Sequence, residues 1–172
     1  MSQKIPLILG FANLSGDDLA PLVSEDARVL SELFERVRIV APHQIPGAHV
    51  LFVYAQLNDD GTIPDMKSCG LRQIAQVTKA RIIILASPNP SDRLLKSMSI
   101  PGPKLANLIF TLDRKGQLFG QFFYSLFDCM RKGEHMLGAW VHLAPQGRIQ
   151  NENAPETLML AEAGKIAFPM PS

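Results

Sequence analysis

An unbroken apolar stretch lies near the middle of the chain, within Ala80–Pro90, which reads ARIIILASPNP. Isoleucine dominates it, and a Ser-Pro-Asn-Pro turn sequence ends it. Successive apolar positions without alternation are typical of a strand that is buried on both faces in the middle of a parallel sheet. Because ligands and reactive groups gather at the carboxyl ends of such strands, the residues of most interest are Ser87, Pro88 and Asn89.

Other short apolar segments are predicted to be the remaining strands, the last of them as a closing strand or hairpin. They are Lys4–Ala12, Val37–Ala41, His49–Leu57, Leu105–Leu112 and Thr157–Phe168. Apolar residues recur every three to four positions in further segments, which predicts amphipathic helices. These are Leu19–Phe34, Asp65–Lys79, Gly116–Lys132 and Glu134–Leu143, with a short helical piece at Asp92–Met98 and loops at Asn58–Pro64 and Pro145–Glu156. This order predicts an α/β protein: a three-layer α/β/α sandwich around a mostly parallel sheet.

The connection between the second and third predicted strands is short. Only Pro42–Gly47 separates them, with a few flanking residues. A crossover between neighbouring parallel strands usually takes a dozen residues or more. Either these two strands are not parallel neighbours, or the second strand is very short.

Length and composition predict one ordinary globular domain over residues 1–172, with 47% apolar and 19% charged residues. A formal net charge of +1 argues against a dedicated nucleic-acid surface. The sequence has no polybasic run, no apolar segment of about 20 residues and no signal peptide, so no membrane association is expected. Cys69 and Cys129 fall inside predicted helices and make no disulfide framework, which favours a reducing, cytoplasmic location.

Motifs for cofactors and metals are not found. The glycines after the first predicted strand lie in GFANLSG, which lacks the dinucleotide-binding spacing, and there is no phosphate-binding P-loop. His135 and His142 share one helix face, but about two turns, or roughly 10 Å, separate them. That is too far for one metal ion. The sequence therefore predicts no cofactor and no metal, and Asp59 and Asp60 are interpreted as turn residues.

Three segments together resemble the caspase-like fold of bacterial CHAT domains, in the caspase–separase superfamily. They are HVLFVYAQLND, IIILASPN and FGQFFYSLFDCMRKGEHMLGAWVHLA. The opening LGFANLSGDDLAPLVSEDARVLSELF and the later LANLIFTLDRKGQ are similar to the family as well, so the resemblance covers about four-fifths of the chain. In that family one strand ends in a His-Gly pair that supplies the base. The next strand ends in a Leu-Ser-Ala-Cys-like element that supplies the nucleophile.

Both dyad positions are altered in this sequence. The resemblance places Leu57 at the position of the histidine and Pro88 at the position of the cysteine. Leucine accepts no proton and proline offers no nucleophile, and Ser87, one position early, belongs to the opposite face of a strand. The resemblance therefore implies no catalytic residue, but a vestigial pocket at the strand ends. Its expected residues are Leu57, Asn58, Asp59, Ser87, Pro88 and Asn89.

These observations favour a pseudo-peptidase: a caspase-like domain that has lost its dyad and works as a protein-interaction or scaffolding module. Its partner would be another protein or, in a homodimer, a second copy of itself. One alternative is an active cysteine or serine hydrolase of the same fold. Its nucleophile would be Ser87 or Cys69, and its base His43 or His49.

A second alternative belongs to a different class. A flavodoxin-like or Toll/interleukin-receptor-like domain could bind a nucleotide or a phosphate. It would use the Asn13–Asp17 loop and the N-terminus of the following helix, where backbone N–H groups favour anions.

Overall fold

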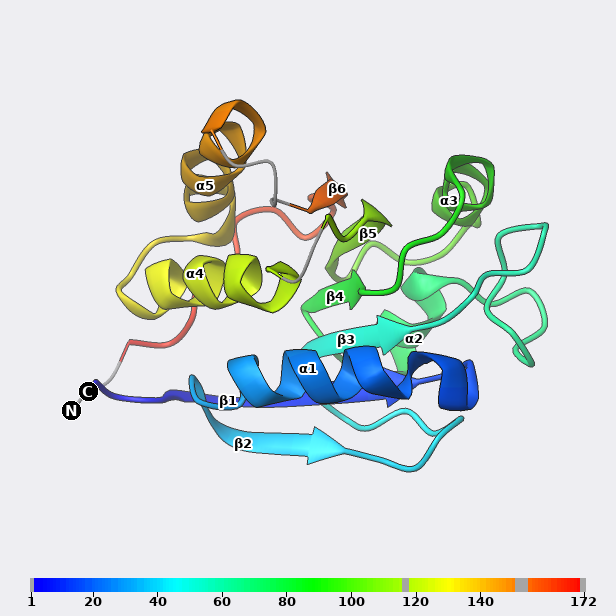
Figure 1. The fold of residues 1–172 in the computed structure, drawn as a ribbon, viewed down its shortest axis with the longest axis horizontal. Helices are drawn as coiled ribbons and strands as arrows, with labels where there is room; N and C mark the ends of the chain where they lie inside the picture. The colour runs from blue at the N-terminus through cyan, green and yellow to red at the C-terminus, as the bar shows by residue number, and fades with distance from the viewer. Residues whose placement is uncertain (1, 116–117, 151–154, 171–172) are drawn as a thin grey trace.

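The computed structural model describes residues 2–115, 118–150 and 155–170, and six strands among them form one sheet (Figure 1). The strands are β1 (Ile5–Asn13), β2 (Phe34–Ile39), β3 (Val50–Tyr54), β4 (Ile82–Leu85), β5 (Asn107–Asp113) and β6 (Glu156–Leu160). Their order is β2-β1-β3-β4-β5-β6. The first five strands run parallel and β6 pairs antiparallel with β5. The predicted mostly parallel sheet is thus confirmed.

Helices cover both faces of this sheet. They are the 3₁₀ helix η1 (Gly16–Leu19), α1 (Ala20–Leu30), α2 (Leu71–Thr78), α3 (Ser91–Met98), α4 (Phe119–Arg131) and α5 (Met136–Gln150). The buried side chains of α1, α4 and α5 share one core cluster, which we call the aromatic core. Those of α2 and α3 share a second cluster on the other face, the aliphatic core. Figure 1 shows α1 lying along β1. The three-layer α/β/α arrangement is therefore also confirmed.

The central strands are buried on both faces, as the unalternated apolar run indicates. In β4, Ile82 and Ile84 point into the aromatic core, while Ile83 and Leu85 point into the aliphatic core. Successive side chains of a strand point to opposite faces, so four successive apolar residues are needed to fill both layers. In the aromatic core, the rings of Phe52 and Phe123 meet edge to face with centroids 5.4 Å apart, a favourable aromatic geometry.

The short connection between β2 and β3 is explained by the strand order. Both strands are parallel neighbours of β1 and not of each other, which is one of the two outcomes that the sequence allows. Residues 40–49 cross over β1 without a helix, and they bring Ala48 and Ile45 against the aliphatic core. They can lie this close because residue 10 of β1 is a glycine. A Cβ atom there would lie 2.7 Å from Ala48 Cβ and 3.0 Å from Pro46 Cγ.

Two predicted helix boundaries are wrong. Helix α1 ends at Leu30, and Phe34 begins β2 opposite Ile5. The apolar pattern continues past the helix because Leu33 and Phe34 are buried in the same aromatic core. Helix α2 begins at Leu71 and not at Asp65. Asp65 has a φ of 62° and Ser68 one of 59°, which a right-handed helix does not contain.

The C-terminal part of the chain differs more from its prediction. Helix α5 continues to Gln150, so the first part of the loop predicted at Pro145–Glu156 is wrong, and residues 151–154 lie outside the described residues. So does Gly116, the predicted start of α4. The last strand ends at Leu160 and makes no hairpin. The chain then returns to the aromatic core, where Ile166 accepts a hydrogen bond from the Met136 N–H at 2.7 Å.

Replacing Gly10 with alanine should destabilise the protein by about 1–3 kcal/mol, because the new methyl group overpacks the crossing between β1 and Ala48. Urea denaturation measures the change. The matched control is Gly47→Ala in the same connection, where a Cβ atom would meet only the flexible end of Arg38. This change should stay within about 0.5 kcal/mol. Equal effects of the two substitutions would contradict the close crossing.

Candidate functional site

The segments that follow β3 and β4 lie side by side at the carboxyl edge of the sheet. The Ser87 hydroxyl accepts a hydrogen bond from the Ala55 N–H at 2.9 Å and donates one to the Ala55 carbonyl oxygen at 2.8 Å. Asn89 Oδ1 accepts from the Leu57 N–H at 2.8 Å, and its Nδ2 donates to the Ala55 carbonyl at 2.9 Å. The structure thus brings together the two chain segments that carry Leu57 and Pro88.

The six residues of the expected pocket differ in their surroundings. Ser87 is 0% exposed, Leu57 1% and Asn89 4%. The Leu57 side chain belongs to the aliphatic core, whereas Pro88 is half-buried. Asn58 and Asp59 are exposed. Leu57, Ser87 and Asn89 are therefore part of the interior. Only Asn58, Asp59 and Pro88 present side-chain surface to a ligand.

Two side chains of helix α3 bind the segment that begins at Leu57. Arg93 donates to the Leu57 carbonyl at 3.0 Å and pairs with Asp59 at 2.6 Å, while Lys96 donates to the Asp59 carbonyl at 2.9 Å. The predicted turn is present, with Gly61 at a φ of +83°. The Thr62 hydroxyl and N–H both donate to Asp60 and lower the pKa of its carboxyl. Asp60 is therefore a turn residue, as its sequence context indicates.

The side chains of an active dyad are not assembled around Ser87. His49 precedes β3, at the opposite edge of the sheet, and its Nδ1 accepts a hydrogen bond from the Ile8 N–H at 2.9 Å. His43 lies beside the end of β1, where its N–H donates to the Asn13 carbonyl, and β3 separates β1 from β4. The Ser87 hydroxyl donates its proton to the Ala55 carbonyl oxygen and accepts a hydrogen bond from the Ala55 N–H. It cannot attack a substrate without breaking those bonds.

Both cysteines are free thiols, Cys69 buried and Cys129 half-buried. Burial raises the pKa of Cys69, and burial followed by the nearby charge of Glu134 raises that of Cys129. A raised pKa disfavours the thiolate that a nucleophile requires. No group of three or more His, Cys, Asp or Glu side chains within residues 2–115, 118–150 and 155–170 has the arrangement of a metal site.

The loop after β1 is closed by its own side chain. Asn13 Oδ1 accepts hydrogen bonds from the N–H groups of Ser15 and Gly16, at 3.2 and 3.1 Å, and Asn13 Nδ2 donates to the Gly16 carbonyl. The Ser15 hydroxyl accepts a bond from the Gln56 N–H at 2.7 Å. A phosphate would need N–H donors at this position, and two of them are already bonded to the Asn13 side chain.

A buried charge cluster at the same edge was not predicted from the sequence. Asp26 of α1, which is 0% exposed, receives two hydrogen bonds from the guanidinium of Arg114, at 2.7 and 2.9 Å. The Tyr54 hydroxyl at the end of β3 donates to Asp26 at 2.7 Å. Arg114 also donates to the Ala86 carbonyl at 3.1 Å and stacks on the Phe119 ring at 4.0 Å. The cluster joins α1, α4 and the ends of three strands.

One signal in the sequence could have revealed this cluster. Val23, Asp26, Ala27 and Leu30 are spaced i, i+3, i+4 and i+7, so the carboxylate falls on the apolar stripe of α1. An acidic residue on such a stripe requires a buried partner. The sequence does not show which of its 17 lysines and arginines provides that partner.

No protein-family model and no curated protein matches the chain. Among the helices that the structure describes, none combines the length and the apolar character needed to cross a membrane. The site must therefore be interpreted from its own chemistry.

Replacing Asp26 with asparagine should lower the free energy of unfolding by about 3–5 kcal/mol, because the buried Arg114 cation loses its close counter-charge. The only other carboxylate beside it, among the described residues, is that of Glu25 at 3.9 Å. Asp18→Asn, at an exposed position of η1, is the control and should cost less than about 1 kcal/mol. Urea denaturation measures both variants. A small effect of Asp26→Asn would contradict the role given to this ion pair.

The stability of the protein should also fall above about pH 10. Burial, and then the charge of Asp26, raise the pKa of Tyr54 well above 10.0. The unfolded chain ionises this tyrosine near pH 10 and the folded chain does not. The stabilisation is therefore complete below pH 10 and is lost as the pH rises above it, at up to about 1.4 kcal/mol per pH unit.

Two variants isolate this contribution. Tyr54→Phe removes the group that titrates, so its stability should fall less steeply above pH 10 than that of the wild type. Tyr124→Phe changes the other tyrosine of the chain, and the assignment requires its stability to fall more steeply than that of Tyr54→Phe. Chemical denaturation at several pH values between about 8 and 11 makes the comparison. Parallel slopes for the wild type and Tyr54→Phe would contradict the assignment.

Proposed function

We propose that the chain is a cytoplasmic, catalytically inactive caspase-like (CHAT-like) domain that acts as a protein-interaction or scaffolding module. The observation that carries the proposal is the adjacency of two segments. Residues 55–57 and 87–89, which follow the neighbouring strands β3 and β4, are hydrogen-bonded to each other. The resemblance requires this adjacency of the base and nucleophile positions, which Leu57 and Pro88 occupy.

The chemistry at these strand ends supports an inactive domain. A buried leucine cannot take a proton, and a proline ring carries no nucleophile. The two polar side chains next to Pro88 bond to the backbone of the adjacent segment: Ser87 to Ala55, and Asn89 to Ala55 and Leu57. A buried polar group without a partner is costly, so these side chains serve the fold. This arrangement therefore supports a role in binding and not in catalysis.

Activity-based probes test the proposal directly. The folded wild-type protein is incubated with a fluorophosphonate, which labels activated serines, and with a peptidyl vinyl sulfone, which labels activated cysteines. We expect no more labelling than in the double variant Ser87→Ala, Cys69→Ala. Strong labelling that disappears on changing either residue would establish an active hydrolase and overturn the proposal.

The structural role of Ser87 gives the same experiment a second measurement. Ser87→Ala removes the partner of the buried Ala55 N–H, and should lower the free energy of unfolding by about 1–3 kcal/mol. Ser125→Ala, at an exposed position of α4, is the control and should stay within about 0.5 kcal/mol. A hydroxyl kept for catalysis would show the opposite pattern, with activity lost and stability retained.

A further inference from the structure

A cationic groove lies at the amino edge of the sheet, opposite the strand ends that carry Leu57 and Pro88. Its volume is about 570 Å³. It is bounded by the end of α2, the chain entering β4, the chain entering β5 and the segment after β6. Its lining residues are Ala75, Gln76, Lys79, Ala80, Arg81, Lys104, Leu105, Glu162 and Ala163. This volume lies within the range of ligand-binding clefts.

The charges in the groove are strongly unbalanced. Lys79, Arg81 and Lys104 are exposed, and within the described parts of the chain no Asp or Glu side chain forms an ion pair with any of them. The one carboxylate in the lining, that of Glu162, is engaged by Arg72 from α2. Three cations therefore face the groove without an internal counter-charge, although the whole chain has a formal net charge of only +1.

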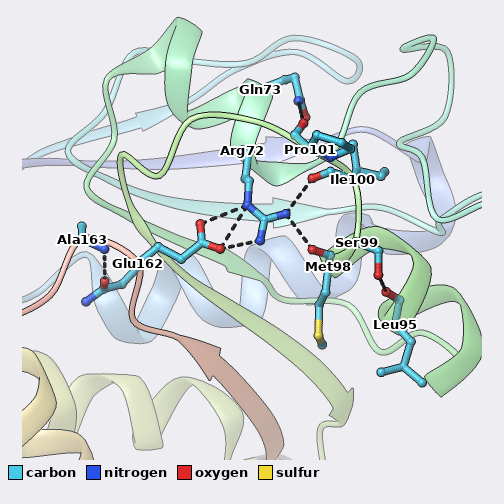
Figure 2. A network of polar contacts seen from close by, with 10 residues as sticks. Arg72, Gln73, Leu95, Met98, Ser99, Ile100, Pro101, Glu162 and Ala163 are labelled. Carbon is cyan, nitrogen blue, oxygen red and sulfur yellow. Dashed lines mark hydrogen bonds and ion pairs between the residues drawn. The ribbon is translucent and has the colours of Figure 1, made fainter.

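The wall of the groove is held by a network of hydrogen bonds and an ion pair, drawn in Figure 2. The Arg72 guanidinium binds both Glu162 oxygens, and it also donates to the carbonyls of Met98 and Ile100 at 2.7 and 2.6 Å. On the other side, Asn107 Oδ1 accepts from the Ala163 N–H at 3.0 Å. These contacts fix α2 and the segment after β6 relative to each other. A groove that is already ordered loses little entropy when a ligand binds.

The lining also indicates the class of ligand. Its apolar surface is formed mainly by Leu105, which is 45% exposed, and by the half-buried Ala163, whereas Ala75 and Ala80 are buried beneath it. Gln76 adds an exposed amide that can hydrogen-bond to a peptide backbone. No aromatic ring is among the lining residues, whereas single-stranded nucleic acids usually require rings on which bases can stack. The chemistry thus favours an acidic peptide over a nucleic acid.

We propose that this groove docks an acidic segment of a partner protein, with carboxylates at Lys79, Arg81 and Lys104 and an apolar residue against Leu105. This docking proposal rests on the protein-interaction role proposed above, and it identifies the surface that would bind the partner. The groove and the altered dyad lie at opposite edges of the sheet. Labelling by the activity-based probes would refute the inactive domain, whereas a failure to bind acidic peptide would refute only the groove.

Fluorescence anisotropy with the full chain tests the docking. The probe is a fluorescein-labelled peptide, Glu-Asp-Glu-Leu-Glu-Asp-Glu, and its neutral analogue is Gln-Asn-Gln-Leu-Gln-Asn-Gln. The acidic peptide should bind and the neutral one should not. The affinity of the acidic peptide should fall as salt is raised, because exposed charges are screened.

Two triple variants with the same change in net charge locate the site. Lys79→Gln, Arg81→Gln, Lys104→Gln should weaken binding by about tenfold or more, because three exposed ion pairs are lost. Arg28→Gln, Arg36→Gln, Lys67→Gln, at exposed positions elsewhere, should change it by less than about twofold. The single reversal Lys104→Glu should also weaken binding, and thermal unfolding checks that every variant is folded.

Three results would overturn the proposal. The first is an acidic peptide that does not bind the wild-type protein at millimolar concentration. The second is an equal loss of affinity in both triple variants, which would show general electrostatic attraction. The third is a single-stranded oligonucleotide that binds the wild-type protein more tightly than the peptide does and whose binding is lost in the groove variant.

Discussion

Burial of the central strands on both faces is the constraint on which the rest of the structure depends. Side chains of β3 and β4 fill the aromatic and aliphatic cores alternately, so helices must cover both faces of the sheet. Water then has little access to the backbone where these strands end. Each N–H and C=O group there needs a partner from the protein itself. The side chains of Ser87 and Asn89 provide those partners for Ala55 and Leu57.

The ion pair between Asp26 and Arg114 meets the same need for internal partners on the other face of the sheet. Helix α1 carries a carboxylate into the interior, where a lone charge would be very costly. Arg114 neutralises it with two hydrogen bonds, and Tyr54 supplies a third. Such a pair adds little net stability by itself. It does fix the position of α1 against the ends of β3 and β5, since either partner alone would be strongly unfavourable.

Both networks lie at the carboxyl edge of the sheet, so this edge is closed, whereas the amino edge is open. At the carboxyl edge, where parallel sheets usually carry their reactive groups, the buried polar side chains are committed to holding strand ends together. At the amino edge, Lys79, Arg81 and Lys104 surround a groove and make no ion pair with any described carboxylate. The scaffold that we propose would bind through the amino edge, and such binding requires no catalytic side chain at Leu57 or Pro88 on the carboxyl edge.

The sequence by itself determined the layers, because local apolar patterns report which residues face a core. It predicted each described strand of the sheet, although β2 and β3 end earlier than expected, at Ile39 and Tyr54. It also placed Leu57 and Pro88 at the ends of consecutive strands that prove to be neighbours, and both residues lie just beyond those strands. Only the tertiary structure decided where one element ends and the next begins. Phe34 fits the apolar spacing of the preceding helix, but it is buried as the first residue of a strand. The tertiary structure alone also paired Asp26 with Arg114, 88 residues away, and gathered the groove. A charged residue on an apolar helix stripe indicates that it needs a buried partner. Which residue becomes that partner depends on how the helices and strands pack together.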